Sequence, residues 1–152
     1  MGNFVFNRGL GRGTQWAENI EANSPTNSKF WLKAWNSSAT DATLKDLDDY
    51  AAVESDANTA EVTNSGYAAK TLVAADVVVT YDDTNDRVDV DVPDQTWTAV
   101  AAGTAWTDLS FGYSTEASPT NAGTLPLSWH DFAITPDGSD ITAQIAVFYR
   151  AA

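Results

Sequence analysis

Apolar and polar residues alternate most regularly in the stretch Ala75–Tyr113. Val77–Tyr81 is a run of β-branched and aromatic residues, Asp82–Asp86 is a cluster of turn-forming residues, and Arg87–Val92 carries valines and charged residues at alternate positions. Because successive side chains of a strand point to opposite faces of a sheet, this pattern predicts a β-hairpin with one apolar and one acidic, wet face.

Five further segments have strand character. We expect Gln95–Val100 and Trp106–Tyr113 to extend the hairpin into an antiparallel meander that Tyr67–Val73 enters. His130–Thr135 and a closing segment, Asp140–Tyr149, alternate in the same way. Since the residues between them, Pro-Asp-Gly-Ser, favour a tight turn, these two segments are predicted to form a final hairpin in the main sheet.

Two segments have a helical pattern instead. Thr14–Ala22 places apolar residues on one side and has Thr14 as a candidate cap. Ala42–Glu54 repeats apolar residues at helical spacing and is preceded by Thr40 and Asp41, either of which is a suitable cap. The chain of 152 residues shows no internal repeat. The prediction is one mainly β domain with minor α structure, spanning residues 14–152: an antiparallel β-sandwich or barrel-like sheet with one or two short helices.

Residues 1–13 are predicted to form a flexible N-terminal arm, because glycines interleave there with Arg8 and Arg12. The arm has two interpretations. In one it docks onto its own domain as an edge strand. In the other it reaches a partner subunit, with Phe4 and Phe6 as anchors and the two arginines paired with carboxylates.

Lys29–Trp35 alternates as well, and it places two lysines on the same face as Trp31 and Trp35. In one interpretation the following helix covers this face and the lysine stems lie over the rings. In the other the face is a half-exposed aromatic and cationic patch of the kind preferred at interfaces. With Trp16 of the first predicted helix, Trp31 and Trp35 complete the set of candidate partner contacts.

The formal charge of −13, from 21 acidic and 8 basic residues, changes the list of possible partners. A chain so acidic is repelled by a phosphate backbone, which disfavours nucleic-acid binding. No apolar run approaches the roughly 18 residues of a membrane span, and Met1–Leu10 lacks the apolar centre of a signal peptide. We therefore expect that the protein is made in a cytoplasm and does not associate with a membrane. The absence of cysteine excludes disulfides and thiolate chemistry.

Catalytic constellations are missing from the sequence pattern. The single histidine, His130, precedes Asp131, but neighbours in a strand point to opposite faces and cannot support each other. The Asp82–Asp86 cluster offers oxygen ligands for a cation, yet it lacks EF-hand spacing and suits turn formation equally well. Carboxylates and tryptophans could also suggest a glycosidase, although no two acids are placed across a cleft by the sequence. No catalytic, cofactor-binding or metal-binding residue is predicted.

Four passages resemble a family of small virion structural proteins of tailed bacteriophages, notably those of actinobacterial hosts. They are NFVFNRGLGR, DATLKDLDDYAAV, GYAAKTLVAADVVVTYDDTNDRVDVDVPDQTWTAV and PLSWHDFAITPDGSDITAQ. The resemblance covers residues 3–150, and its specificity lies in the DDTNDR passage through PDQTW and in HDFAITPDGSD.

The resemblance implies a capsid decoration (cement) protein that binds outside the major capsid shell, bridges capsid subunits and self-associates as a trimer or dimer. Its partner would be the major capsid protein, its location the virion exterior, and it would carry no catalytic residues. Two alternatives remain at this point: a minor tail or tail-tip protein, and a carbohydrate-binding adsorption module motivated by the tryptophans.

Overall fold

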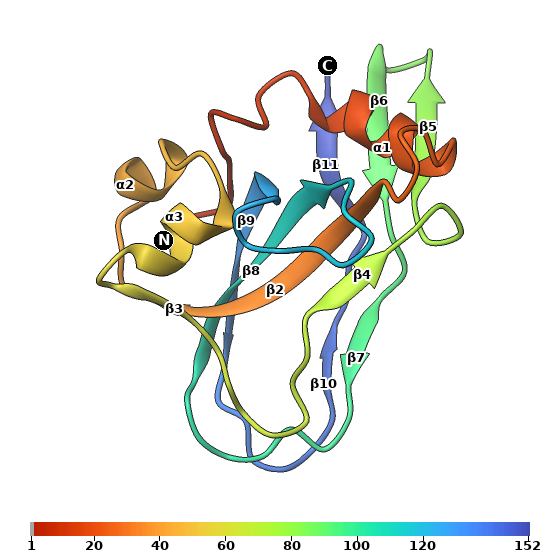
Figure 1. Ribbon diagram of the computed structural model, residues 1–152. Helices are drawn as coiled ribbons and strands as arrows, with labels where there is room; N and C mark the ends of the chain where they lie inside the picture. Colours follow the sequence, from red (N-terminus) through yellow and green to blue (C-terminus); the bar gives the residue numbers. More distant parts are fainter. Residues whose placement is uncertain (1) are drawn as a thin grey trace.

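The structure is a computed structural model that describes residues 2–152, and Figure 1 shows its elements. The strands are β1 (Phe4–Val5), β2 (Lys29–Ser37), β3 (Thr59–Glu61), β4 (Lys70–Leu72), β5 (Val78–Asp82), β6 (Arg87–Asp91), β7 (Gln95–Trp97), β8 (Trp106–Ser114), β9 (Leu125–Ile134), β10 (Ile141–Ala143) and β11 (Val147–Ala151). The helices are α1 (Gly13–Glu21), α2 (Asp41–Lys45) and α3 (Tyr50–Ser55). The predicted class, mainly β with minor α in antiparallel sheets, is confirmed, and within residues 2–152 no sheet closes into a barrel.

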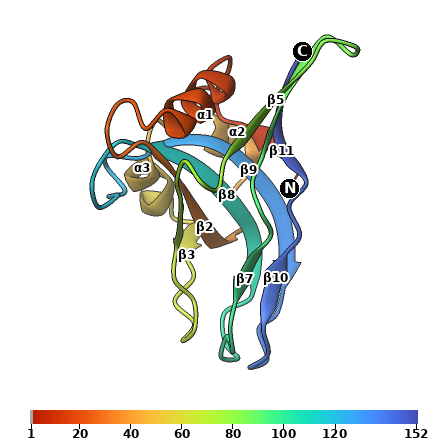
Figure 2. The same cartoon turned by 90° about the vertical axis from the view of Figure 1, so that its right-hand side faces the viewer.

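A six-stranded antiparallel sheet forms the centre of the molecule. Its order is β1-β9-β8-β2-β3, and β4 also pairs with β2. The long strands β2 and β8 align from Lys29 opposite Ser114 to Trp35 opposite Asp108. In Figure 1, α2 and α3 lie to the left of this sheet and strands β7 and β10 lie to its right, and Figure 2 shows the curvature of β8 and β9. The sheet therefore has two covered faces.

Each face of the central sheet has its own core. The larger core lies between the sheet and the layer formed by α1, β5-β6-β11 and β7-β10. Its bulkiest buried members are Trp16, Phe30, Trp97, Trp106, Phe111, Tyr113, Phe148 and Tyr149. The smaller core lies under α2 and α3 and contains Phe4, Phe6, Trp35, Leu44, Tyr50, Val53 and Trp129. Since aromatic side chains dominate both cores, they supply the volume that this alanine-rich chain otherwise lacks.

The β5–β6 hairpin is confirmed, with Val78 opposite Asp91 and Asp82 opposite Arg87. The predicted meander is wrong. β7 pairs with β10, β8 lies between β2 and β9, and the third strand beside the hairpin is β11 from the C-terminus. The residues after β6, Pro93 and Asp94, do not reverse the chain, so β7 continues into a different sheet.

The predicted final hairpin is also wrong, because its two halves pair elsewhere. β9 pairs with β8, β10 with β7 and β11 with β6. The residues of the expected tight turn bond instead to the neighbouring loop: the N–H of Gly138 donates to the carbonyl of Val100, whose own N–H donates to the carbonyl of Ser139. These bonds direct the chain away from β9 and across to β7.

The helices differ from prediction at their ends. α1 is confirmed, but Thr14 is its second residue and not its cap. Arg12 occupies the N-cap position, and its side chain makes no capping hydrogen bond to the helix. The predicted helix Ala42–Glu54 is wrong: it is two helices, α2 and α3. Thr40 caps α2 as expected, while the Asp49 side chain accepts the N–H of Ala52 at 2.7 Å and starts α3. Aspartate prefers such caps to helix interiors.

The N-terminal segment is an ordered part of the fold, which corrects the predicted flexible arm for residues 2–13. Phe4 and Val5 pair with Trp129 and Ser128 of β9. The N–H of Phe6 then donates to the carbonyl of Leu127 at 2.9 Å. The docked edge strand is thus the correct interpretation, because burying two phenylalanines outweighs the entropy that an unattached arm would keep.

Candidate interaction surface

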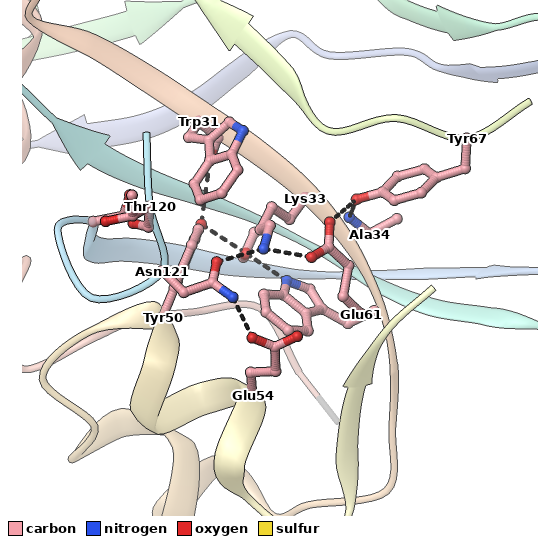
Figure 3. Close-up of polar contacts among 12 residues, drawn as sticks. Trp31, Lys33, Ala34, Tyr50, Glu54, Glu61, Tyr67, Thr120 and Asn121 are labelled. Carbon is pink, nitrogen blue, oxygen red and sulfur yellow. Dashed lines mark hydrogen bonds and ion pairs between the residues drawn. The ribbon is translucent and has the colours of Figure 1, made fainter. Parts of the chain in front are cut away.

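A polar network centred on Lys33 occupies the interior beside α3 (Figure 3). Lys33 is 1% exposed, and its Nζ lies 2.5 Å from Glu61 Oε2. The same ammonium donates to Asn121 Oδ1 at 2.6 Å and lies 4.2 Å from the centre of the Trp31 ring. A buried charge needs such compensation, because leaving water costs it several kcal/mol.

Two tyrosines extend the network around Lys33. Tyr67 accepts the N–H of Ala34 and donates its hydroxyl proton to Glu61 at 2.9 Å. Tyr50 accepts from Ser110 Oγ at 2.8 Å. Burial raises the pKa of both tyrosines far above the usual range, so each remains a neutral hydrogen-bond donor.

The rings of Trp31, Trp35 and Tyr50 form an aromatic cage, and the occupant of that cage is the chain's own Lys33. Trp35 is fully buried and Trp31 is half-buried. The second lysine of the same strand, Lys29, is also buried and donates to two carbonyls of the 115–124 loop, at 2.7 and 2.9 Å. The interpretation with a covered face and lysine stems over the rings is therefore correct, and this cage is a structural centre.

The structure separates the candidate contact residues into two groups. Phe4, Phe6, Trp16 and Trp35 are at most 8% exposed, so they are core residues and cannot anchor a partner. Arg8 and Arg12 are exposed and Trp31 is half-exposed. Trp97, Trp106 and Trp129 are buried as well, so of the five tryptophans that suggested a carbohydrate-binding module only Trp31 is partly exposed.

Two arginines on the three-stranded sheet β5-β6-β11 form ion pairs with carboxylates. Arg150 Nε lies 2.5 Å from Asp89, and Arg87 Nε lies 3.2 Å from Asp82 and 3.3 Å from Asp89. The hydrogen bond from Arg150 lowers the pKa of Asp89, and bonds from Asn85 lower that of Asp82. Lys29 and Lys33 are buried, and Arg87 and Arg150 are paired with carboxylates, so four of the eight basic residues already have partners within the chain.

The Asp82–Asp86 turn satisfies its own bonding requirements. Asp82 accepts the backbone N–H groups of Thr84 and Asn85, and the Asn85 amide at 2.7 Å. These are the bonds of ordinary turn chemistry. Across residues 2–152, no group of three or more His, Asp or Glu side chains is arranged to hold a metal ion.

A cleft of about 210 Å³ opens between β9 and residues 144–148. Its walls are of mixed polarity, and the apolar side chains are those of Leu109, Phe111, Phe132, Ile145, Val147 and Phe148. Asn3, His130, Asp131 and Gln144 supply its polar groups. Sequence patterns do not indicate this cleft, because it lies between segments that are distant in the chain. Alternation over Asp140–Tyr149 predicts one continuous strand, whereas the structure has a break at residues 144–146 that forms one wall of the cleft.

His130 lies at this cleft, and its Nε2 is 2.9 Å from Ser128 Oγ. Burial lowers the pKa of His130 from 6.5 to about 4. As pH falls, His130 is protonated in the unfolded chain before it is protonated in the folded protein. The folding stability that is present above pH 6.5 is therefore lost as pH approaches 4. The loss attributable to His130 is about 3 kcal/mol.

A His130→Gln variant isolates this contribution, because glutamine keeps a hydrogen-bonding group but does not titrate. We expect urea unfolding at a series of pH values to show a wild-type stability that falls more steeply between pH 6.5 and 4 than that of the variant. The carboxylates titrate in both proteins and cancel in the difference. Parallel pH profiles would contradict the assigned burial of the imidazole.

Comparison with known proteins gives no relative: no protein-family model, no curated protein and no solved structure matches the chain. Among residues 2–152, none of the helices has both the length and the apolar character needed to cross a membrane.

Proposed function

We propose that this chain is a structural protein of a tailed-bacteriophage virion, and specifically a decoration protein that binds the outside of the major capsid shell and bridges its subunits as a dimer or trimer. The resemblance of residues 3–150 to such proteins motivates the proposal. The strongly acidic surface supports it, because an acidic exterior favours a protein partner with a basic surface over a nucleic acid.

The observation that carries the proposal is the position of two turns, one within each of the two most specific passages of the resemblance. DDTNDR forms the exposed tip of the β5–β6 hairpin, and PDGSD forms the exposed turn after β9. Figure 1 shows these turns at opposite ends of the molecule. A molecule with contact surfaces at both ends can bridge two neighbours, and many weak contacts become cooperative on a repeating lattice.

The test is the location and copy number of the chain in purified particles of its phage. Quantitative mass spectrometry is expected to give copies in proportion to the major capsid protein, and a cryo-EM reconstruction is expected to show the chain on the outer shell. Copies in proportion to tail components would instead assign the protein to the tail, and absence from the particle would overturn a virion role.

A further inference from the structure

The edge of β9 is open beyond its short pairing with β1. The partner residues of β1 end at Trp129. Of the two described residues before Phe4, Gly2 donates its N–H to Asp41, and Asn3 accepts the N–H of Asp131 in β9 through its side chain at 2.8 Å. Among the described residues no strand lies beside 130–134 on this side. An open edge is a template for one more strand.

The opposite wall of the cleft is also unpaired. β10 ends at Ala143 and belongs to the sheet with β7, while β11 begins at Val147 and belongs to the sheet with β6. Residues 144–146 between them join no sheet. Figure 2 shows this segment running beside β9, and both line the cleft. Val147 on its rim is 37% exposed, which is unusual for a large apolar residue next to buried rings.

The charge of the cleft defines the kind of segment that fits it. Its lining contains no lysine or arginine, and exposed Asp131 lies on the rim. Asp94 is close by, because its carboxylate accepts the N–H of Ile145 at 2.7 Å. At this cleft a second copy of the chain, with its charge of −13, is a poorer electrostatic match than a basic segment, so the self-association proposed above is expected to use another surface. A segment with lysine or arginine beside apolar residues matches both the walls and the rim.

We propose that the cleft between β9 and residues 144–148 binds an extended segment of a partner protein, in which apolar and basic residues alternate, and that this segment adds a strand to the open edge of β9. Backbone hydrogen bonds to β9 supply affinity, apolar side chains enter the cleft beside Phe111 and Phe148, and basic side chains meet Asp131. The inference rests on the proposed function only for the identity of the partner, which would be the major capsid protein.

The full-length ¹⁵N-labelled protein allows a test without virions. The probe is a short peptide of alternating lysine and valine. Its binding is measured by the NMR chemical-shift changes and the amide-exchange rates of the labelled protein. Val147→Asn is the test variant, because it removes the apolar side chain without changing the charge, and Val78→Asn is its matched control, because both valines are exposed and both lie opposite Asp91 in the same sheet. A peptide of alternating glutamate and valine controls for charge.

We expect shifts confined to residues 130–134 and 144–148, slower amide exchange on β9, and binding that is about tenfold weaker in Val147→Asn but unchanged in Val78→Asn. Shifts at β5 or spread over the acidic surface, equal binding by both variants, or equal binding of the acidic peptide would each overturn the proposal. Failure of the virion role leaves this result unaffected, and a virion protein whose cleft ignores the probe would refute only the inference.

Discussion

Replacing Lys33 with methionine is expected to lower the free energy of unfolding by about 3 kcal/mol. Methionine keeps the length of the side chain, so the loss arises from electrostatics more than from a cavity. The Glu61 carboxylate loses its ion pair at 2.5 Å, Asn121 loses its donor, and the cage loses its cation. Because the Glu61 side chain is 22% exposed and can recruit water, the cost is at the lower end of that for a broken buried pair.

Two further variants separate the broken pair from a general effect of substitution. Lys33→Met combined with Glu61→Gln removes the orphaned charge and is expected to recover most of the stability, with a remaining loss of about 1 kcal/mol. Lys70→Met, at a more exposed lysine that also lies over a tryptophan, is expected to cost about 1 kcal/mol or less. Denaturant unfolding of all three proteins measures these differences, and equal effects for Lys33 and Lys70 would show that the network contributes no more than a surface contact.

Replacing Phe6 with alanine is expected to lower the free energy of unfolding by about 3–5 kcal/mol. Phe6 is fully buried, and its ring contacts those of Phe4 and Trp129 with centroids 5.2 and 6.1 Å apart. Removing the ring leaves a cavity beneath α2, in the smaller of the two cores.

Leu10→Ala in the same segment is the matched control. Leu10 is 60% exposed, so its truncation is expected to change stability by no more than about 0.5 kcal/mol. If both variants unfold like the wild type, the N-terminal segment is not part of the fold. Deleting the whole segment cannot test partner binding cleanly, since it would remove Phe4 and Phe6 from the core and reduce binding through loss of stability alone.

The features that were predicted correctly depend on near neighbours in the chain. The β5–β6 hairpin follows from alternation on both sides of an Asp- and Asn-rich turn, and α1 follows from its apolar stripe. The break between α2 and α3 could have been recognised from Asp49, which is three residues before the N–H that it caps. Apolar periodicity alone favoured one long helix and concealed this local signal.

The candidate contact residues were misassigned because composition does not report burial. Phe4 and Phe6 beside arginines and glycines have the composition of a binding arm, yet an open edge of β9 and a space beneath α2 accept them within the same chain. Trp31, Lys33 and Trp35 were correctly placed on one face of a strand. Whether that face met solvent, a partner or the chain's own helices depended on elements that follow much later.

Composition and contacts between near neighbours are enough to predict the strand-rich class, the acidic surface, the β5–β6 hairpin and the first helix. The pairing of the strands, the place of Lys33 in its own aromatic cage and the cleft between β9 and residues 144–148 depend instead on parts of the chain that are far apart in sequence. They cannot be read locally, because an isolated strand offers the same backbone groups to every possible neighbour. Its actual partner is selected by which side chains are buried together when the whole chain folds.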